Sequence, residues 1–128
     1  MLGVPSSAAE AGDMSDDLLD DEGYPTDAAV DRILNFEGTP QEFIDYIKSL
    51  WAYRLFGTDT ELDDWGKPYV RFHLATGGWS GNETIIGAVE KTMFSFMFWE
   101  SSRRGGAFEY RIRESILHQS GNWGEWRN

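Results

Sequence analysis

The residues with the clearest potential for binding chemistry form a glycine-rich turn, Thr76-Gly77-Gly78-Trp79-Ser80-Gly81-Asn82-Glu83. Three glycines in five positions allow backbone torsions that other residues avoid, and they let a ligand approach the main chain closely. A turn of this kind that leads into a helix directs backbone N–H groups outward, where they can bind an anion. We therefore expect a ligand site made by the central residues of the turn, which are Gly77, Gly78, Trp79, Ser80, Gly81 and Asn82.

An anion site also needs a cation, and two strand-like runs supply candidates. Residues 69–75 and 107–113 alternate apolar and polar side chains, as half-buried strands do. A predicted helix from residue 83 to about residue 100 would place Arg103 and Arg104 roughly 25 Å from the turn, at 1.5 Å per residue. The strand positions are therefore the better candidates, and they are Arg71, His73, Arg111 and Arg113.

The same turn also fits a purely structural role. In that case Trp79 fills a core position, and Ser80 or Asn82 caps the following helix. The turn has neither the Lys-Ser/Thr pair of a Walker loop nor the Gly-x-Gly-x-x-Gly spacing of a dinucleotide site. Glu83 at the helix start would repel a phosphate unless it serves as a cap. Both the structural turn and the ligand site remain open at this point.

Catalytic and metal-binding patterns are weak in this sequence. There is no cysteine, and the two histidines, His73 and His118, are 45 positions apart, which matches no metal-ligand spacing. The acidic residues at 59–64 lack the order of a calcium loop. We expect no metal, no cofactor and no catalysis. The alternative is a small enzyme acting on a nucleotide or phosphoester, with Glu83 or His73 as the acid–base group.

The negative charge of the chain is concentrated towards its N-terminal end. Residues 1–40 carry ten acidic side chains and one basic, whereas the remaining residues contribute only −2 to the net charge of −11. Residues 1–23 are small, polar and acidic, so we expect a disordered arm, followed by a single domain over residues 24–128. Without a basic stripe, direct binding to nucleic acid is not expected.

The sequence also predicts a cytoplasmic protein that does not bind membranes. No apolar run approaches the length of a membrane span, and the N-terminus lacks the basic start and apolar run of a signal peptide. The absence of cysteine is compatible with a reducing compartment.

Apolar side chains recur with helical spacing in three segments, which lie between Thr26 and Gly38, between Thr39 and Gly57, and from residue 83 to about residue 100. The second helix start is the best specified, with Thr39 as N-cap, Pro40 at the first position and Glu42 three residues after the cap. Ser80 and Glu83 repeat that capping spacing before the third helix.

We interpret residues 57–68 as a loop. The two alternating runs alone would form only a marginal sheet. We therefore expect a further short strand within 60–68 or 115–126. Together these elements predict an α+β fold, in which a small sheet packs with three helices.

Two segments have more apolar surface than their elements require. Met93–Trp99, at the end of the third predicted helix, is hydrophobic almost all round. It is either enclosed in the core or covered by a partner, and a homodimer through this segment is possible. The C-terminal stretch His118–Asn128, with Trp123 and Trp126, either folds back on the domain or forms an exposed docking peptide.

Four short motifs resemble those of small uncharacterised accessory proteins encoded by phages of actinobacteria. They are Asp-Glu-Gly-Tyr-Pro-Thr at 21–26, the glycine turn at 76–83, Phe98-Trp99, and Ser-Ser-Arg-Arg-Gly-Gly at 101–106. The resemblance covers about residues 21–113. It implies a setting in the host cytoplasm, where such proteins bind host components. We accordingly expect a non-catalytic phage-type protein that binds a host protein or a small anionic or nucleotide ligand.

Overall fold

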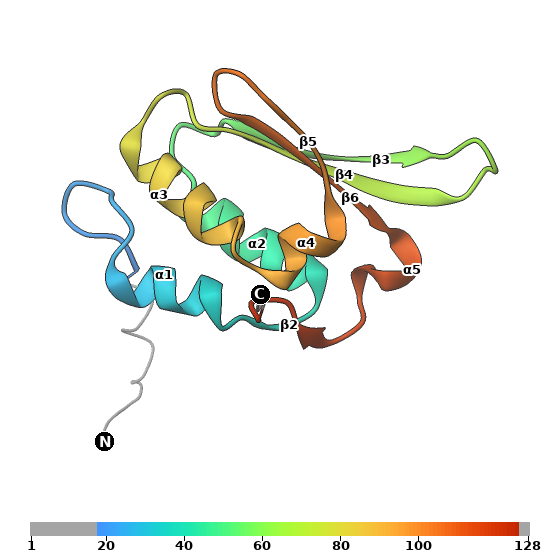
Figure 1. Ribbon diagram of the computed structural model, residues 1–128, viewed down its shortest axis with the longest axis horizontal. Coiled ribbons are helices and arrows are strands. Elements are labelled where there is room, and N and C mark those ends of the chain that lie inside the picture. The colour runs from blue at the N-terminus through green and yellow to red at the C-terminus, as the bar shows by residue number, and fades with distance from the viewer. Residues whose placement is uncertain (1–17, 126–128) are drawn as a thin grey trace.

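A four-stranded antiparallel sheet forms one layer of the structure, a computed structural model that describes residues 18–125 (Figure 1). Its strand order is β3 (Phe56–Leu62), β4 (Pro68–Ala75), β6 (Ala107–Arg113) and β5 (Trp99–Arg103). The two alternating runs of the sequence are the central strands β4 and β6, which pair along their whole length from Tyr69↔Arg113 to Ala75↔Ala107. The α+β fold expected from the sequence is therefore confirmed.

The helices gather on one side of this sheet (Figure 1). They are α1 (Asp27–Leu34), α2 (Pro40–Leu50), α3 (Ser80–Val89), α4 (Met93–Phe98) and the single turn α5 (Glu114–Leu117). None of the helices within residues 18–125 combines the length and the apolar character needed to cross a bilayer.

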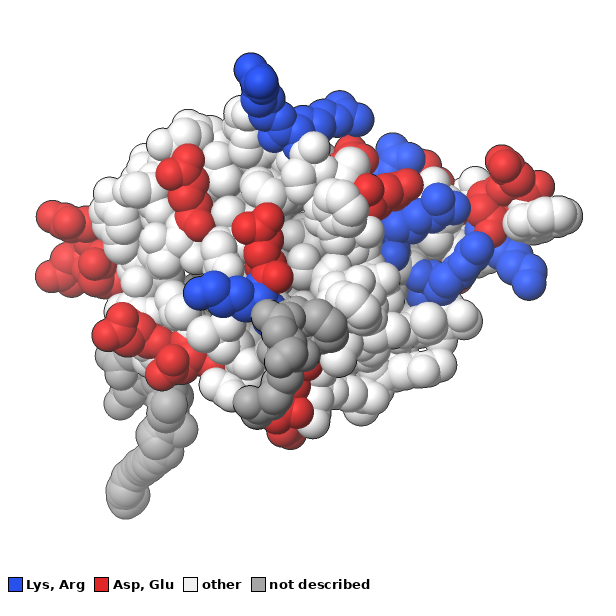
Figure 2. Space-filling model, viewed as in Figure 1, with Lys and Arg blue, Asp and Glu red and all other residues white. Residues whose placement is uncertain are grey.

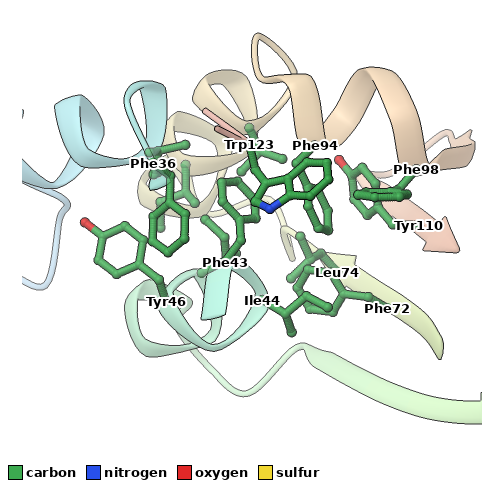
Figure 3. Close-up of a cluster of buried hydrophobic side chains, with 14 of the residues drawn as sticks. Phe36, Phe43, Ile44, Tyr46, Phe72, Leu74, Phe94, Phe98, Tyr110 and Trp123 are labelled. Atoms are coloured by element: carbon green, nitrogen blue, oxygen red, sulfur yellow. The ribbon is translucent and has the colours of Figure 1, made fainter. Parts of the chain in front are cut away.

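The core lies between the sheet and these helices, and aromatic rings fill its centre (Figure 3). Phe94 of α4 is fully buried; its ring centroid lies 4.4 Å from that of Phe43, 5.0 Å from that of Phe98 and 5.5 Å from that of Tyr110. These stacked and edge-on contacts join α2, α4 and β6. The segment that was predicted to be either buried or partner-covered is thus divided, with Phe94 and Phe98 in the core and Phe96, Met97 and Trp99 exposed.

A second, two-stranded sheet folds the C-terminal stretch back onto the domain. It pairs β2 (Glu37–Gly38) with β7 (Gly121–Asn122). The indole Nε1 of Trp123 donates to the Gly38 carbonyl at 3.0 Å, and the Gly124 N–H donates to the Phe36 carbonyl at 2.9 Å. Trp126 lies outside the described residues.

The capping signals correctly predict two helix starts. The Thr26 hydroxyl accepts from the Ala29 N–H at the start of α1. At α2, Thr39 and Glu42 form the expected capping box, with bonds of 3.0 and 2.9 Å. The predicted extension of α2 to Gly57 is wrong, because the helix ends at Leu50.

The predicted third helix is wrong in length and in its cap. Its cap residue is Trp79, which makes no side-chain capping bond, and Ser80 already lies in the first turn. The helix stops at Val89, and a new helix starts after Thr92, whose hydroxyl donates to the Val89 carbonyl and accepts from the Ser95 N–H. This local pairing offers the backbone an alternative to a continuous helix.

The predicted loop at 57–68 is largely a strand. Phe56–Leu62 is β3, which pairs with β4 and includes part of the stretch where a further strand was expected. Its middle residues are polar on both faces, so the alternation that identifies a half-buried strand is missing from this edge strand.

The described structure starts earlier than the predicted domain boundary at residue 24. Leu18 and Leu19 pack against the core, and the Leu18 carbonyl accepts from the Thr26 N–H at 3.0 Å. Leu18 and Leu19 of the predicted arm therefore contact the domain. Residues 1–17 and 126–128 lie outside the described part of the chain.

Candidate functional site

The glycine turn is organised around Thr76, which is buried at the end of β4. Its hydroxyl accepts from the Gly78 N–H at 3.3 Å, and its carbonyl accepts from the Trp79 N–H at 3.1 Å. Gly77 and Gly78 have φ angles of 63° and 75°, which favour glycine strongly. A Cβ on Gly77 would also lie 2.5 Å from the Leu55 side chain. Both glycines are exposed, so their backbone is open to a partner.

Asn82 fastens the turn to the loop that follows α2. Its side chain is fully buried; Oδ1 accepts from the Ala52 N–H at 2.9 Å, and Nδ2 donates to the carbonyls of Ala52 and Thr76 at 3.3 Å each. The structure therefore places this predicted ligand residue in the interior, where it fixes the position of the neighbouring loop.

Trp79 lies between two tyrosines from other parts of the chain. The centroid of its ring is 4.7 Å from that of Tyr24 and 5.8 Å from that of Tyr53. The Ser80 hydroxyl donates to the Tyr24 hydroxyl at 3.1 Å. A Cβ on Gly81 would overlap the Trp79 ring, so the absence of a side chain at position 81 leaves the space that the indole occupies. Trp79 is half-buried and packs at the surface, although the structural interpretation of the sequence expected it in the core.

The loop beside Trp79 holds two consecutive residues in the left-handed region. Tyr53 and Arg54 have φ angles of 66° and 54°, and no other described non-glycine residue has a positive φ. Left-handed backbone costs a non-glycine residue roughly 1–2 kcal/mol. Both side chains are exposed, Tyr53 by 69%. We call the surface formed by Tyr24, Tyr53, Arg54, Gly77, Gly78 and Trp79 the turn surface.

The sheet residues predicted to help the glycine turn lie away from it. They point to the sheet face opposite the helices, and each has a carboxylate nearby. Arg71 is 3.1 Å from Glu61, and His73 is 3.9 Å from Asp59. Arg71 lies six residues before Gly77, which is about 20 Å along a strand at 3.3 Å per residue.

The other two predicted arginines also have acidic partners on this face. Arg111 is 3.7 Å from Glu100 and stacks over the Tyr69 ring, whereas Arg113 pairs with Asp63. Both line a hollow of about 280 Å³ under the β3–β4 hairpin, together with Leu62, Asp63, Asp64, Trp65 and Tyr69. Since acidic side chains share this hollow with the arginines, it offers no excess positive charge to an anion.

Asp63 closes the β3–β4 hairpin. Only 5% of its side chain is exposed, and it accepts from the N–H groups of Lys67 at 2.9 Å and Trp65 at 2.8 Å as well as from Arg113. The hydrogen bond from the Lys67 N–H, with those from Arg113 and Trp65, lowers the pKa of Asp63 to about 2.

This pKa predicts a specific pH dependence. Because the folded carboxyl has a lower pKa than the unfolded one, its contribution to stability is present above about pH 4 and is lost as the pH falls towards 2. In Asp63→Asn, the free energy of unfolding should therefore depend less on pH between 4 and 2 than in the parent chain. Urea titrations at several pH values measure this. If Asp64→Asn reduced the pH dependence of the free energy of unfolding as much as Asp63→Asn does, the effect would not be specific to Asp63.

Arg103 and Arg104 lie closer to the glycine turn than the sequence predicted. The expected separation assumed one unbroken helix from 83 to 100. Instead, the helix breaks at Thr92, and the chain continues into β5, which pairs antiparallel with β6. In the turn between these two strands, the Gly106 carbonyl accepts from the Thr76 N–H at 3.0 Å. The turn between β5 and β6 thus borders the glycine turn.

The candidate catalytic groups remain apart. Glu83 is exposed on the first turn of α3, and His73 lies on the sheet face. Between residues 18 and 125, no three histidine, aspartate or glutamate side chains are placed to hold a metal ion together.

Comparisons with protein-family models, curated proteins and solved structures found no match to the chain.

Three residues of the turn surface were missed by the sequence analysis. Tyr24 was placed at the boundary of the arm, and Tyr53 and Arg54 were read as the end of a helix. A positive φ is usually signalled by glycine or asparagine, and neither occurs at 53 or 54. Only the folded chain brings Tyr24 and Tyr53 to Trp79.

Proposed function

We propose that this chain is a non-catalytic binding protein whose turn surface docks on another protein. The observation that carries this proposal is the strained pair Tyr53–Arg54, both of which are exposed and of which Tyr53 lies beside Trp79. Strained backbone persists where the surrounding structure holds it, and it concentrates at functional sites. Here Asn82 holds Ala52, the residue immediately before the strained pair, through both of its backbone groups.

The residue types of the turn surface favour a protein partner. Tryptophan, tyrosine and arginine are the residues most enriched among the energetic hot spots of protein interfaces. Tyr53 and Trp79 supply apolar area on a rigid support, and the exposed Gly77 and Gly78 let a partner approach the backbone. Preorganisation of this kind reduces the entropy lost on binding.

The charge on the Tyr24 side of the turn surface favours a partner with a basic rim over a free anion. Asp20, Asp21 and Glu22 are exposed in the loop that leads to Tyr24, and Asp20 accepts from the Tyr24 N–H at 2.9 Å. Acidic side chains cluster at the end of the molecule where this loop lies, at the left of Figure 2, whereas basic ones gather elsewhere. The expected partner has an apolar socket for Tyr53 and Trp79 with lysines or arginines around it.

The resemblance to actinobacterial phage proteins suggests where this partner would be found. On that resemblance, the chain is an accessory protein of infection that acts in the host cytoplasm, and its partner is a host protein. The alternative ligand, a small anionic molecule or nucleotide, would use the backbone N–H groups at the start of α3 together with Arg54.

In the test, the full chain is immobilised on a resin and incubated with an extract of an actinobacterial host. Tyr53→Ala/Arg54→Ala should lose a captured protein that the parent chain retains, and the purified partner should bind this variant at least tenfold more weakly. Trp65→Ala is the matched control, because Trp65 is 84% exposed at the tip of the distant β3–β4 hairpin. Calorimetric titration measures both affinities.

Two results would contradict the proposal. Equal binding of the partner by the parent and Tyr53→Ala/Arg54→Ala would place the interface elsewhere. A rise in the unfolding midpoint with phosphate or nucleotides, lost in Arg54→Ala, would instead identify a small anion as the ligand.

A further inference from the structure

The sheet has an exposed edge at β5, beside a group of apolar side chains. Within the described chain, β5 pairs with β6 on one side and with no strand on the other. Directly before it, Phe96 and Met97 of α4 are 63% and 51% exposed, and Trp99 at the start of the strand is 52% exposed. Together with Glu90, Ser95 and Ser102, Phe96 and Trp99 line a hollow of about 360 Å³. An edge strand next to exposed apolar area is a template for adding another strand.

The charges of β5 are complementary to those of the same strand in the opposite direction. Glu100 lies near its start, whereas Arg103 ends the strand and Arg104 follows it. The two arginines are exposed, and the structure shows no ion pair for either within residues 18–125. An antiparallel copy of the strand would therefore bring the acidic end of each chain to the basic end of the other.

A two-fold axis at Ser102 gives a register that respects both faces of the sheet. Arg103 pairs with Ala107 and Ser101 with Glu109, on the face opposite the helices, whereas Ser102 pairs with Phe108 on the helix side. With the axis at Ser102, Ser101 stands opposite Arg103 of the second copy. A β-bulge between Trp99 and Ser101 contains Glu100, and Arg104 follows the last strand residue, so these two charges lie close together at each end of the strand pair. Within residues 101–103, where the strand is regular, residues of one face then meet residues of the same face.

The other edge of the sheet lacks this complementarity. The charged side chains of β3 are Asp59 and Glu61, both acidic. An antiparallel copy of β3 would place carboxylates beside carboxylates, which destabilises a strand pair. The charge pattern thus distinguishes the edge that can pair with itself from the edge that cannot.

We infer that the chain forms a two-fold symmetric homodimer through antiparallel pairing of β5, flanked by Phe96, Met97 and Trp99. The pairing joins two four-stranded sheets into one continuous sheet, and the apolar side chains of α4 supply area beside the new strand pair. This interface uses none of the residues that define the turn surface, so the variants that test it are distinct from Tyr53→Ala/Arg54→Ala.

Sedimentation of the full chain from low to high micromolar concentration tests the dimer. The parent chain should pass from a monomer of 14.6 kDa to twice that mass. Glu100→Arg should remain a monomer, because it places arginine against Arg103 and Arg104 of the second copy. Arg103→Glu/Arg104→Glu should also remain a monomer, because it places glutamates against Glu100.

Mixing these two variants is the decisive step. Each is monomeric alone, but an equimolar mixture should form a heterodimer, because the charge pattern of one variant then complements that of the other. This outcome also excludes misfolding as the cause of dissociation. Asp59→Arg, the same change on the opposite edge strand, should leave the parent dimer intact.

Three outcomes would overturn the inference. The first is a parent chain that stays monomeric at high micromolar concentration. The second is a dimer that survives both charge reversals. The third is a mixture of the two reversed variants that does not associate.

Discussion

Phe94→Ala is expected to lower the free energy of unfolding by about 3–5 kcal/mol, the range for removing a buried phenylalanine ring. Phe94 is fully buried, and its ring touches those of Phe43, Phe98 and Tyr110. The substitution therefore removes the contacts that join α2, α4 and β6, and it leaves a cavity that the surrounding rings can fill only in part. Chemical denaturation measures the change.

A second phenylalanine replacement and a surface control sharpen this prediction. Phe94→Leu retains most of the buried volume and should cost less than Phe94→Ala. Trp65→Ala removes a larger aromatic ring, but one that is 84% exposed, and should change the free energy of unfolding by less than about 0.5 kcal/mol. Equal effects of Phe94→Ala and Trp65→Ala would contradict the described packing.

Asn82→Ala is expected to cost about 3–5 kcal/mol, since unsatisfied buried polar groups cost roughly 1–3 kcal/mol each. The substitution leaves the N–H and the carbonyl of Ala52 without their partner, and it removes one of the two donors to the Thr76 carbonyl, which keeps the Trp79 N–H. It also releases the loop that carries Tyr53 and Arg54. Binding through the turn surface should therefore weaken in the fraction of the protein that remains folded.

Asn82→Asp tests the role of the amide more closely. An aspartate retains the acceptor for the Ala52 N–H but buries a charge and loses the Nδ2 donor, so its folded pKa should rise. Because the folded pKa then exceeds the unfolded one, the penalty is present at neutral pH and is relieved as the pH falls below the folded pKa.

An exposed asparagine serves as the control for both substitutions. Asn122→Ala, at the surface in β7, should change stability by less than about 0.5 kcal/mol. A cost for Asn82→Ala no greater than that of Asn122→Ala would contradict the described hydrogen bonds of Asn82.

The segment that the sequence analysis proposed for self-association shows how far periodicity alone can lead. The sequence pointed to Met93–Trp99 because its apolar side chains cover a helix on all sides. The structure buries Phe94 and Phe98 and leaves Phe96, Met97 and Trp99 outside. The segment is a short helix of its own, α4, which begins after the cap residue Thr92 and ends at Phe98, and Trp99 already starts β5, so only one face of it packs on the core.

The sequence by itself determined the features that depend on local spacing. The alternation of 69–75 and 107–113 identified the two central strands, because each strand buries one face against the helices. The capping box at Thr39 and Glu42 identified the start of α2, because its bonds span only three residues. The glycines at 77 and 78 correctly marked a turn that needs positive φ angles.

Only the tertiary structure decided which side chains meet. Arg71 and Arg111 looked available to the glycine turn, but strand pairing places them beside Glu61 and Glu100 on the far face of the sheet. Conversely, Tyr24 and Tyr53 meet at Trp79 although they lie 55 and 26 residues before it. Such contacts depend on where whole elements pack, and that packing is set by burial summed over the entire core rather than by the spacing of neighbouring residues.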